Sequence, residues 1–492
     1  MNMMRHPGFL QPVRILLALC IASATSSPAQ IFTTLATFDF TNGDAPFGPL
    51  VQGTDGNFYG TTYGGGKGNS GTLFKITPAG AVTTVHSFCA KRNCADGSLP
   101  GVSLVQGTDG NFYGTTLLGG KNAGGTVFKL TAKGKLTTIY NFCSQPNCTD
   151  GDRPLAGIVQ GADGALYGTT AAGGTGQSAG TVFRITTKGN LITLYSFCSQ
   201  QNCADGQEPL AALAQATDGS FYGTTQYGGV GAGQSGTIFK ITSEGAFSTL
   251  YSFCSQPNCA DGSFPEAPLV QGADGNFYGT TQEGGNGTFG GGTVFKVSPS
   301  GALTTLHMFG TQPSDGSTPV GGLVQATDGN FYGTTSLGGS ALGGEIFSIN
   351  PQGTLTNLYG FCSQPNCADG SSPYDSPVQG TNGTFYGLTA RGGVISCDPD
   401  NAGCGTVFSL SLGLRPFVET RPTSGKAGKK VIVLGTNLTG ATGVSFNGTA
   451  ATFNVISSTE ITAKVPKHAT TGLVTVTTPD GNFASNVPFI IQ

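Results

Sequence analysis

Acidic residues recur at two fixed places in this sequence and are the side chains best suited to chemistry. One set precedes the glycine of a short turn phrase: Asp55, Asp109, Asp163, Asp218, Asp274 and Asp328, with Asn382 in the seventh place. The other set precedes a glycine after a cysteine-rich stretch: Asp96, Asp150, Asp205, Asp261, Asp315 and Asp369, with Asn42 in the first place. Asp before Gly suits tight turns. Calcium binding by carboxylate and carbonyl oxygens is the alternative. No copy holds a dense group of acids, so we expect turns and no cofactor.

Catalytic constellations are scarce. His86 and His307 stand where other copies of a repeat carry tyrosine, and His468 lies in a predicted loop. No histidine-based triad and no G-x-S-x-G nucleophile elbow is visible, and the GKAGKK stretch at residues 425–430 lacks the spacing of a phosphate loop. Paired acids for glycoside cleavage would have to come from different repeats. We therefore predict no catalytic residues and a protein that is not an enzyme.

Seven copies of the phrase DGNFYGTT organise most of the chain. Their aromatic cores start 54–56 residues apart, at Phe58, Phe112, Leu166, Phe221, Phe277, Phe331 and Phe385. One unit holds four short β-rich segments, at residues 102–106, 111–116, 125–130 and 136–142, separated by turn signals. Four antiparallel strands per repeat predict a seven-bladed β-propeller. The Phe-Tyr pair of each phrase is then covered by neighbouring blades and is expected to be core.

The two ends of the repeat region complement each other. The last copy has three strands, at residues 376–379, 384–389 and 405–410, and lacks the fourth. Residues 32–40 (FTTLATFDF) resemble an isolated fourth strand. We expect this N-terminal strand to complete blade seven, because that arrangement removes an exposed sheet edge.

Twelve cysteines form six close pairs, five of them with the spacing C-x4-C. Such even spacing in an exported chain implies disulfides, whereas no pair has a second pair or a histidine at zinc-ligand spacing. Each small loop constrains the unfolded chain by only about 2 kcal/mol. The predicted bridges are Cys89–Cys94, Cys143–Cys148, Cys198–Cys203, Cys254–Cys259, Cys362–Cys367 and Cys397–Cys404.

Composition and the N-terminus indicate export. Charged residues make up 10% of the 492 residues and the net charge is −3, too little positive charge for a nucleic-acid binder. Residues 1–29 read as a signal peptide with a short apolar stretch, cleaved after Ala24 or Ala29. A lipoprotein site at Cys20 is the alternative. No later segment is apolar enough to span a membrane, so we expect a secreted or cell-surface protein, monomeric, without nucleic-acid partners.

The segment after the propeller (residues 30–413) differs in pattern. Residues 414–492 alternate short predicted strands with turns, at 430–434, 443–446, 452–456, 460–465, 473–477 and 487–491, which is typical of a β-sandwich. The phrases VIVLGTNLTGATGVSFNG, STEITAKVP and GLVTVTTPDG resemble the IPT/TIG family of immunoglobulin-like domains. The repeated LVQGTDGNFYGTT…GGTVFKLT resembles the GloVer (Gloeo/Verruco) tandem-repeat family of exported bacterial proteins. The first resemblance implies a spacer or interaction module; the second implies fold and location.

Loop variation indicates where a ligand would bind. In a propeller the loops after strands four and two share one face, and here these are the disulfide and Gly-rich loops, whereas the opposite turns are short and uniform. Variable loops on a rigid scaffold tend to carry function, so we predict binding or adhesion, with polysaccharide or a surface protein as partner. A lyase or glycoside hydrolase, to be tested at Glu208 and Glu283, and a structural display protein are the alternatives. The candidate ligand residues are Lys91, Arg92, Arg153, Glu208, Tyr227, Glu283 and Arg391.

Overall fold

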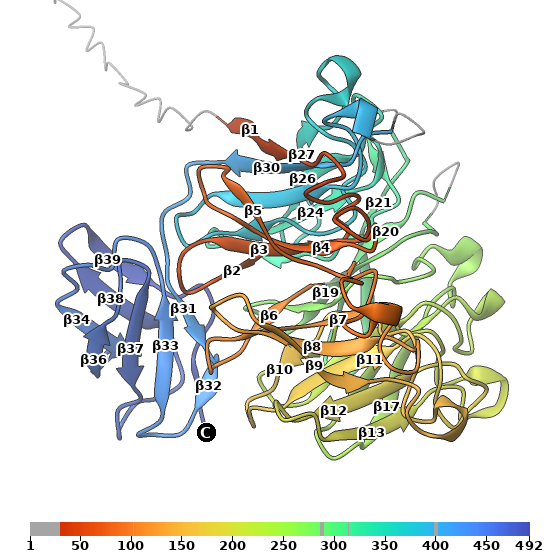
Figure 1. The fold of residues 1–492 in the computed structure, drawn as a ribbon, viewed down its shortest axis with the longest axis horizontal. Coiled ribbons are helices and arrows are strands. Elements are labelled where there is room, and N and C mark those ends of the chain that lie inside the picture. Colours follow the sequence, from red (N-terminus) through yellow and green to blue (C-terminus); the bar gives the residue numbers. More distant parts are fainter. Residues whose placement is uncertain (1–29, 102, 286–289, 313, 398–401) are drawn as a thin grey trace, which may run out of the picture.

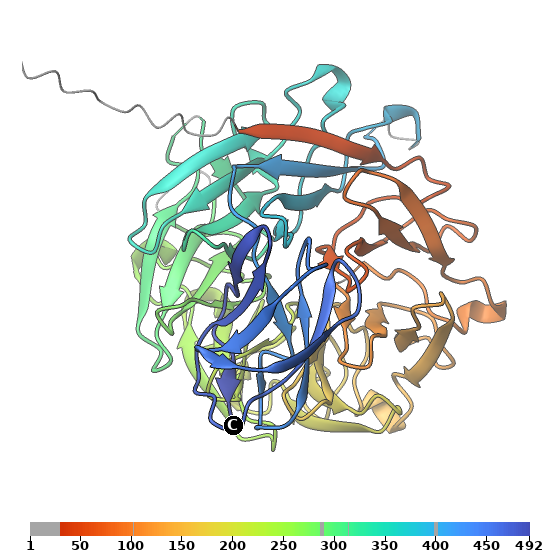
Figure 2. The same cartoon turned by 90° about the vertical axis from the view of Figure 1, so that its left-hand side faces the viewer.

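Seven four-stranded antiparallel sheets surround a central axis, and a β-sandwich follows them (Figure 1). The structure, a computed structural model, describes residues 30–101, 103–285, 290–312, 314–397 and 402–492. The predicted signal peptide and its cleavage site lie outside these residues. Viewed along the axis, the sheets form a closed ring (Figure 2). The predicted fold, a seven-bladed propeller with a C-terminal immunoglobulin-like sandwich, is confirmed.

Each blade runs from a short inner strand to a longer outer strand, in chain order. Blade one consists of β2 (Val51–Gln52), β3 (Phe58–Thr62), β4 (Thr72–Ile76) and β5 (Val82–Ser87). Blade two consists of β6 (Val105–Gln106), β7 (Phe112–Thr116), β8 (Thr126–Leu130) and β9 (Leu136–Asn141). Blade three consists of β10 (Val159–Gln160), β11 (Leu166–Thr170), β12 (Thr181–Ile185) and β13 (Leu191–Ser196). Blade four consists of β14 (Ala214–Gln215), β15 (Phe221–Thr225), β16 (Thr237–Ile241) and β17 (Phe247–Ser252). Blade five consists of β18 (Val270–Gln271), β19 (Phe277–Thr281), β20 (Thr293–Val297) and β21 (Leu303–Met308). Blade six consists of β23 (Val324–Gln325), β24 (Phe331–Thr335), β26 (Glu345–Ile349) and β27 (Leu355–Gly360). A two-stranded sheet of β22 (Gly316–Ser317) and β25 (Leu337–Gly338) borders blade six.

The N-terminal strand closes the ring as predicted. Blade seven consists of β28 (Val378–Gln379), β29 (Phe385–Thr389), β30 (Thr406–Ser411) and β1 (Ile31–Thr37). β1 pairs antiparallel with β30, from Ile31 opposite Ser411 to Thr37 opposite Thr406. The outermost position of the last blade is therefore filled by residues that lie 369 to 380 positions before their partners in the chain.

The innermost strands are shorter than predicted. Residues 102–106 were expected to form a strand, but β6 comprises only Val105–Gln106, and β28 likewise begins at Val378 rather than at residue 376. Each inner strand follows a proline, such as Pro100 or Pro154, by a few residues. A proline has no N–H for a ladder hydrogen bond. Residue 102 lies outside the described residues, and the described positions 103 and 104 form no strand.

Two belts of contacts join neighbouring blades. The tyrosine of one blade contacts the phenylalanine of the next, as Tyr167 does Phe221, with ring centroids 4.0 Å apart. Tyr386 of blade seven meets Phe58 of blade one at 4.1 Å, which carries the belt across the closure. Leu166 replaces the ring in blade three. These aromatics are almost fully buried, so the prediction that they are core is confirmed.

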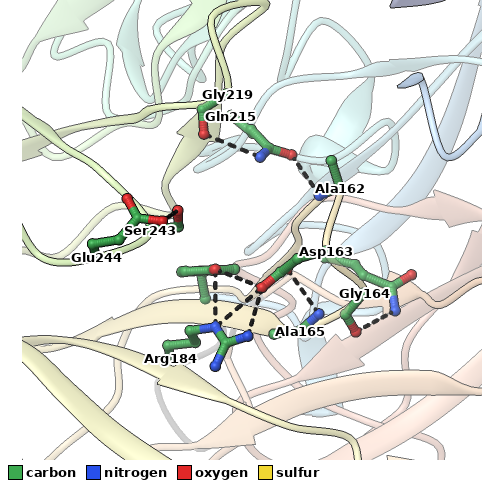
Figure 3. A network of polar contacts seen from close by, with 11 residues as sticks. Ala162, Asp163, Gly164, Ala165, Arg184, Gln215, Gly219, Ser243 and Glu244 are labelled. Carbon is green, nitrogen blue, oxygen red and sulfur yellow. Dashed lines mark hydrogen bonds and ion pairs between the residues drawn. The ribbon is translucent and has the colours of Figure 1, made fainter. Parts of the chain in front are cut away.

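A glutamine from every inner strand forms the second belt. Gln215 Oε1 accepts a hydrogen bond from the backbone N–H of Ala162 in the preceding blade at 3.0 Å, and its Nε2 donates to Gly219 (Figure 3). The same acceptor contact occurs in all seven blades, and Gln52 completes it by accepting from Thr381 at 2.9 Å. The repeat therefore supplies inter-blade hydrogen bonds as well as apolar packing.

The C-terminal sandwich packs against one face of the ring (Figure 1). Its strands are β31 (Glu419–Arg421), β32 (Ser424–Gly425), β33 (Lys430–Leu434), β34 (Gly443–Phe446), β35 (Thr449–Ala450), β36 (Thr452–Val455), β37 (Glu460–Lys464), β38 (Val474–Thr478), β39 (Gly481–Ala484) and β40 (Ile490–Ile491). The last is shorter than the predicted strand at 487–491. Arg421 donates to Gln106 at 3.0 Å, and Thr459 Oγ1 donates to the carbonyl of Thr54 at 2.7 Å. The sandwich thus covers the face that carries the first hairpin turns.

Candidate ligand site at the mouth of the ring

The face opposite the sandwich carries the disulfide loops and the Gly-rich loops, as the topology predicted. Backbone bridges join the two kinds of loop within each blade, as between Ser98 and Leu118 or between Gln207 and Tyr227. One-turn 3-10 helices lie in five disulfide loops, two of them Pro146–Cys148 and Gln201–Cys203. This face is therefore the one on which non-repeating side chains can gather.

The second aspartate set anchors the disulfide loops. All six predicted disulfides form among the described residues. In the loop that leads from blade two into blade three, Asp150 accepts hydrogen bonds from Tyr140 Oη at 2.8 Å, from Ser144 N at 2.9 Å and from Gln145 N at 3.1 Å. Burial raises the pKa of Asp150, but these hydrogen bonds outweigh that effect and lower its pKa overall. The carboxylate is engaged as a structural acceptor.

His86 and His307 take the place of the tyrosine in this arrangement. His86 Nε2 lies 3.0 Å from Asp96 Oδ2, and His307 Nε2 lies 3.3 Å from Asp315 Oδ2. Each imidazole also packs edge-on against a buried phenylalanine, His86 on Phe88 at 4.9 Å. Both histidines thus contact the aspartate of their loop, as the equivalent tyrosine does in other blades.

The first aspartate set lies on the sandwich side of the ring. Asp163 accepts from the N–H of Ala165 and from Tyr167 Oη, and it pairs with Arg184 at 2.7 Å (Figure 3). Asp109 and Asp218 pair in the same way with Lys129 and Lys240. Within the part of the chain that the structure describes, no three His, Cys, Asp or Glu side chains are grouped to hold a metal ion.

The candidate ligand residues lie on the loop face but are spread around it. Arg153 and Glu208 occupy equivalent positions after the disulfide loops of successive repeats, and both are exposed. Tyr227, Glu283 and Arg391 occupy equivalent positions after the second strand, each bridged to the neighbouring loop. Tyr227 contacts Phe264, with ring centroids 5.5 Å apart. Exposed Lys91 and Arg92 lie on the first disulfide loop.

A cavity of about 280 Å³ opens on the axis of the ring, and none of those seven residues lines it. Every blade contributes the residue that follows its repeated proline: Phe47, Gly101, Leu155, Leu210, Glu266, Val320 and Tyr374. Asp375 also lines the cavity. At this position the seven repeats carry seven side chains of six kinds. The mouth of the ring is therefore one place where the repeats differ.

Two aromatic rings form one wall of the cavity. Phe47 of blade one and Tyr374 of blade seven meet edge-on, with ring centroids 5.0 Å apart, and Tyr63 packs on Phe47 at 5.6 Å. Tyr374 remains 37% exposed. An exposed tyrosine held by a second ring offers a flat apolar surface with a hydroxyl group at its edge.

Two carboxyl groups from different blades line the same cavity. Burial raises the pKa of Asp375 to about 7, although Ser376 donates to it from its backbone N–H at 2.7 Å and more weakly from its hydroxyl. Burial also raises the pKa of Glu266 despite its hydrogen bond from Gln226 Nε2, and the charge of Glu283 adds to the rise. Perturbed carboxyl groups in a concave site are typical of functional sites.

Sequence reasoning missed this site, although one signal was available. The residue after each repeated proline differs between repeats, although the proline itself and the Val-Gln or Ala-Gln pair of the inner strand recur. The candidate residues lie on the loops themselves, whereas the cavity is lined by the short segments that lead from those loops into the inner strands.

The fold and this site define a ring scaffold that presents a variable axial cavity and carries an immunoglobulin-like module on its other face. The chain belongs to the Gloeobacter/Verrucomicrobia repeat family, whose profile matches residues 23–204 and 198–408. Residues 418–490 match the IPT/TIG domain. No curated protein matches the sequence.

Solved structures of similar fold include a candidate 6-phosphogluconolactonase from Bacteroides uniformis, 17% identical, with a TM-score of 0.41 over 63% of this chain and 83% of that one. The extracellular domain of a hybrid two-component system from B. thetaiotaomicron is 12% identical, with a TM-score of 0.46 over 90% of this chain and 52% of that one. A candidate glucose dehydrogenase from Thermus thermophilus is 14% identical, with a TM-score of 0.42 over 78% of this chain and all of the other. Likeness at this level says nothing about activity.

Two observations bear on location. The disulfides and the IPT/TIG domain are consistent with an extracellular protein. Among the helices that the structure describes, none is long and apolar enough to cross a membrane.

Proposed function

We propose that this protein is a secreted or cell-surface binding protein that recognises a glycan at the mouth of its ring without turning it over. The observation that carries the proposal is the axial cavity, at which seven similar blades present different side chains. Binding sites of this kind combine apolar and aromatic walls with a few polar groups. Tyr374 and Phe47 supply the flat apolar surface on which the apolar face of a sugar ring packs, and Glu266 and Asp375 supply hydrogen-bonding groups.

The cavity volume of about 280 Å³ lies just below the range of about 300–1,000 Å³ typical of small-molecule pockets. The cavity therefore suits the end of a glycan or a short side branch better than the length of a polymer. The loops around the mouth, pinned by disulfides, would contact the rest of the chain. A rigid ring loses little conformational entropy on binding, which favours affinity.

A glycan and polysaccharide array tests this function, using the oxidised mature protein with calcium and with chelator. We expect binding that Tyr374→Ala weakens by about tenfold or more, since an aromatic contact contributes about 0.5–1.5 kcal/mol in addition to the effect of the apolar area it buries. Tyr227→Ala is the matched control, because Tyr227 lies on the same face but outside the cavity. A blank array, or equal loss in both variants, would contradict the proposal.

Glycoside cleavage is the second candidate, and the two carboxyl groups of the cavity favour it. Cleavage uses one carboxyl as acid and another as base or nucleophile, and Asp375, with its pKa near 7, is suited to donate a proton at neutral pH. If the protein is an enzyme, Glu266→Gln and Asp375→Asn abolish the release of reducing ends even when the glycan is saturating. Release of reducing ends from an array hit separates the two functions.

A further inference from the structure

The carboxyl groups of the axial cavity have no cationic partner within the part of the chain that the structure describes. Glu266 accepts a hydrogen bond from Gln226, and Asp375 accepts from Ser376. Neither forms an ion pair with a lysine, arginine or histidine of the described residues. Buried or half-buried carboxylates are usually paired, because removing a charge from water is costly. A cationic group on a ligand would supply this partner.

On the side of blades four and five, the charged residues around the cavity are also acidic. Glu208 and Glu283 are exposed next to the cavity-lining segments of those blades, and Glu283 lies close enough to Glu266 to affect its ionisation. The cations named above on this face lie elsewhere: Arg153 is beside Asp152 at 3.8 Å, Lys91 and Arg92 are on the first disulfide loop, and Arg391 belongs to the loop of blade seven. This half of the mouth attracts positive charge.

The aromatic wall favours a cation independently of the acids. A cation over the face of tyrosine or phenylalanine is attracted by the ring quadrupole. Tyr374 and Phe47 line the cavity together with Asp375 and Glu266. A metal ion would need several ligating side chains around one point, and no such group occurs among the described residues. An ammonium group satisfies both the carboxylates and the rings.

We propose that the ligand of the axial cavity is a glycan that carries free amino groups, with the ammonium bound between the carboxylates of Glu266 and Asp375 and the ring of Tyr374. This inference rests on the proposed glycan binding and adds the charge of the ligand. Hydrogen bonds between charged groups are roughly twice as strong as neutral ones, so the amine determines specificity.

Titration calorimetry with three probes tests the inference: a β-linked glucosamine oligomer, the fully N-acetylated oligomer of the same length, and oligolysine. We expect the glucosamine oligomer to bind at least about tenfold more tightly than the acetylated one, with an affinity that falls as salt is raised. Equal affinity for the two oligomers would overturn the inference and leave glycan binding intact. If neither oligomer binds, both proposals fail, and if oligolysine binds as tightly as glucosamine, the site recognises charge alone and the glycan assignment is wrong.

Variants locate the amine. Asp375→Asn and Glu266→Gln should each weaken binding of the glucosamine oligomer by about tenfold and change binding of the acetylated oligomer little. Glu244→Gln is the control, because Glu244 is an exposed carboxylate in a turn between outer strands, away from the cavity. The two substitutions are judged separately, so a folding defect in one leaves the other decisive. Unchanged glucosamine binding in a folded variant would remove that carboxylate from the site.

Discussion

Asp150 shows how one residue determines the shape of a whole loop. Its carboxylate accepts hydrogen bonds from Tyr140, from both the backbone and hydroxyl of Ser144, and from Gln145. Asp205, Asp261 and Asp369 repeat the pattern in other blades. The disulfide closes each loop, but the aspartate holds it against the outer strand.

Replacing this carboxylate should destabilise the protein. We expect Asp150→Asn to lower the free energy of unfolding at neutral pH by about 1–3 kcal/mol, the cost of leaving buried donors without a good acceptor. Because the pKa of Asp150 is lowered in the folded state, its contribution is present above the unfolded pKa and is lost as pH falls through the folded pKa.

Urea unfolding at neutral and acidic pH measures this contribution. Asp480→Asn, in an exposed turn of the sandwich, provides a matched control that should change little. Equal stability of Asp150→Asn and the parent at neutral pH would show that the disulfide alone holds the loop.

At the scale of the element, blade six departs from the repeat. The loop that leads into blade six contains no cysteine pair. In addition, Glu345 occupies the position at which other blades have a threonine that hydrogen-bonds to a second threonine, as Thr181 does to Thr170 at 2.8 Å. In blade three the N–H of Gly151 donates to the carbonyl of Cys148. In blade six the corresponding N–H of Gly316 donates to Glu345 Oε1 at 3.0 Å. In blade six a side chain of the third strand thus supplies an acceptor for this N–H.

This replacement makes blade six sensitive to pH. Burial raises the pKa of Glu345 to about 7, since only 1% of the side chain is exposed, and the nearby Asp315 adds to the rise. A raised pKa gives a contribution to stability that is full below the unfolded pKa and is lost as pH rises through the folded value. We expect Glu345→Gln, which keeps the acceptor, to become more stable than the parent above pH 7 by about 2–3 kcal/mol.

Thermal melting of both proteins at acidic and alkaline pH checks this expectation, with the difference between the proteins isolating Glu345 from other groups. Glu460→Gln in the sandwich is the control, because it leaves blade six untouched. The expectation fails if the two melting curves shift in parallel across the range.

At the scale of the whole molecule, the ring depends on a non-local closure. β1 reaches blade seven across the length of the propeller, and Phe32 in β1 stacks on Tyr359 with ring centroids 3.7 Å apart. Phe247 in β17 makes the same stacked contact with Tyr195, at 3.8 Å. The two contacts differ mainly in connectivity, because a tight turn joins β17 to its partner strand and no such turn joins β1 to β30.

Connectivity should decide the outcome of two otherwise similar substitutions. We expect Phe32→Ala to increase hydrogen exchange in both β1 and β30 by about tenfold or more, because a detached terminal strand leaves its neighbour as a free edge. Phe247→Ala should have a smaller effect, confined to β17. Mass-spectrometric exchange reports both segments, and similar exchange in the two variants would show that closure contributes nothing beyond the stacking.

The repeats determine much of this protein by themselves. The period of the aromatic phrase, the four β-rich segments per unit and the missing last strand predicted seven blades and their closure, because strand formation and turns depend on neighbouring residues. The cysteine spacing predicted the bridges for the same reason. At the ends of strands the prediction was less accurate, as at β6 and β40, where hydrogen-bond partners from other segments decide the last residue.

Only the tertiary structure decided which side chains meet on the axis. Glu266 and Asp375 are separated by more than 100 residues, and nothing local marks either as part of a site. They converge because each blade is rotated about a common axis, so that the segments after the repeated prolines all line the same cavity. The burial that raises their pKa values, and the lack of a cation beside them, are properties of that convergence. A sequence states which residues repeat, but the closed ring determines which of the exceptions lie together.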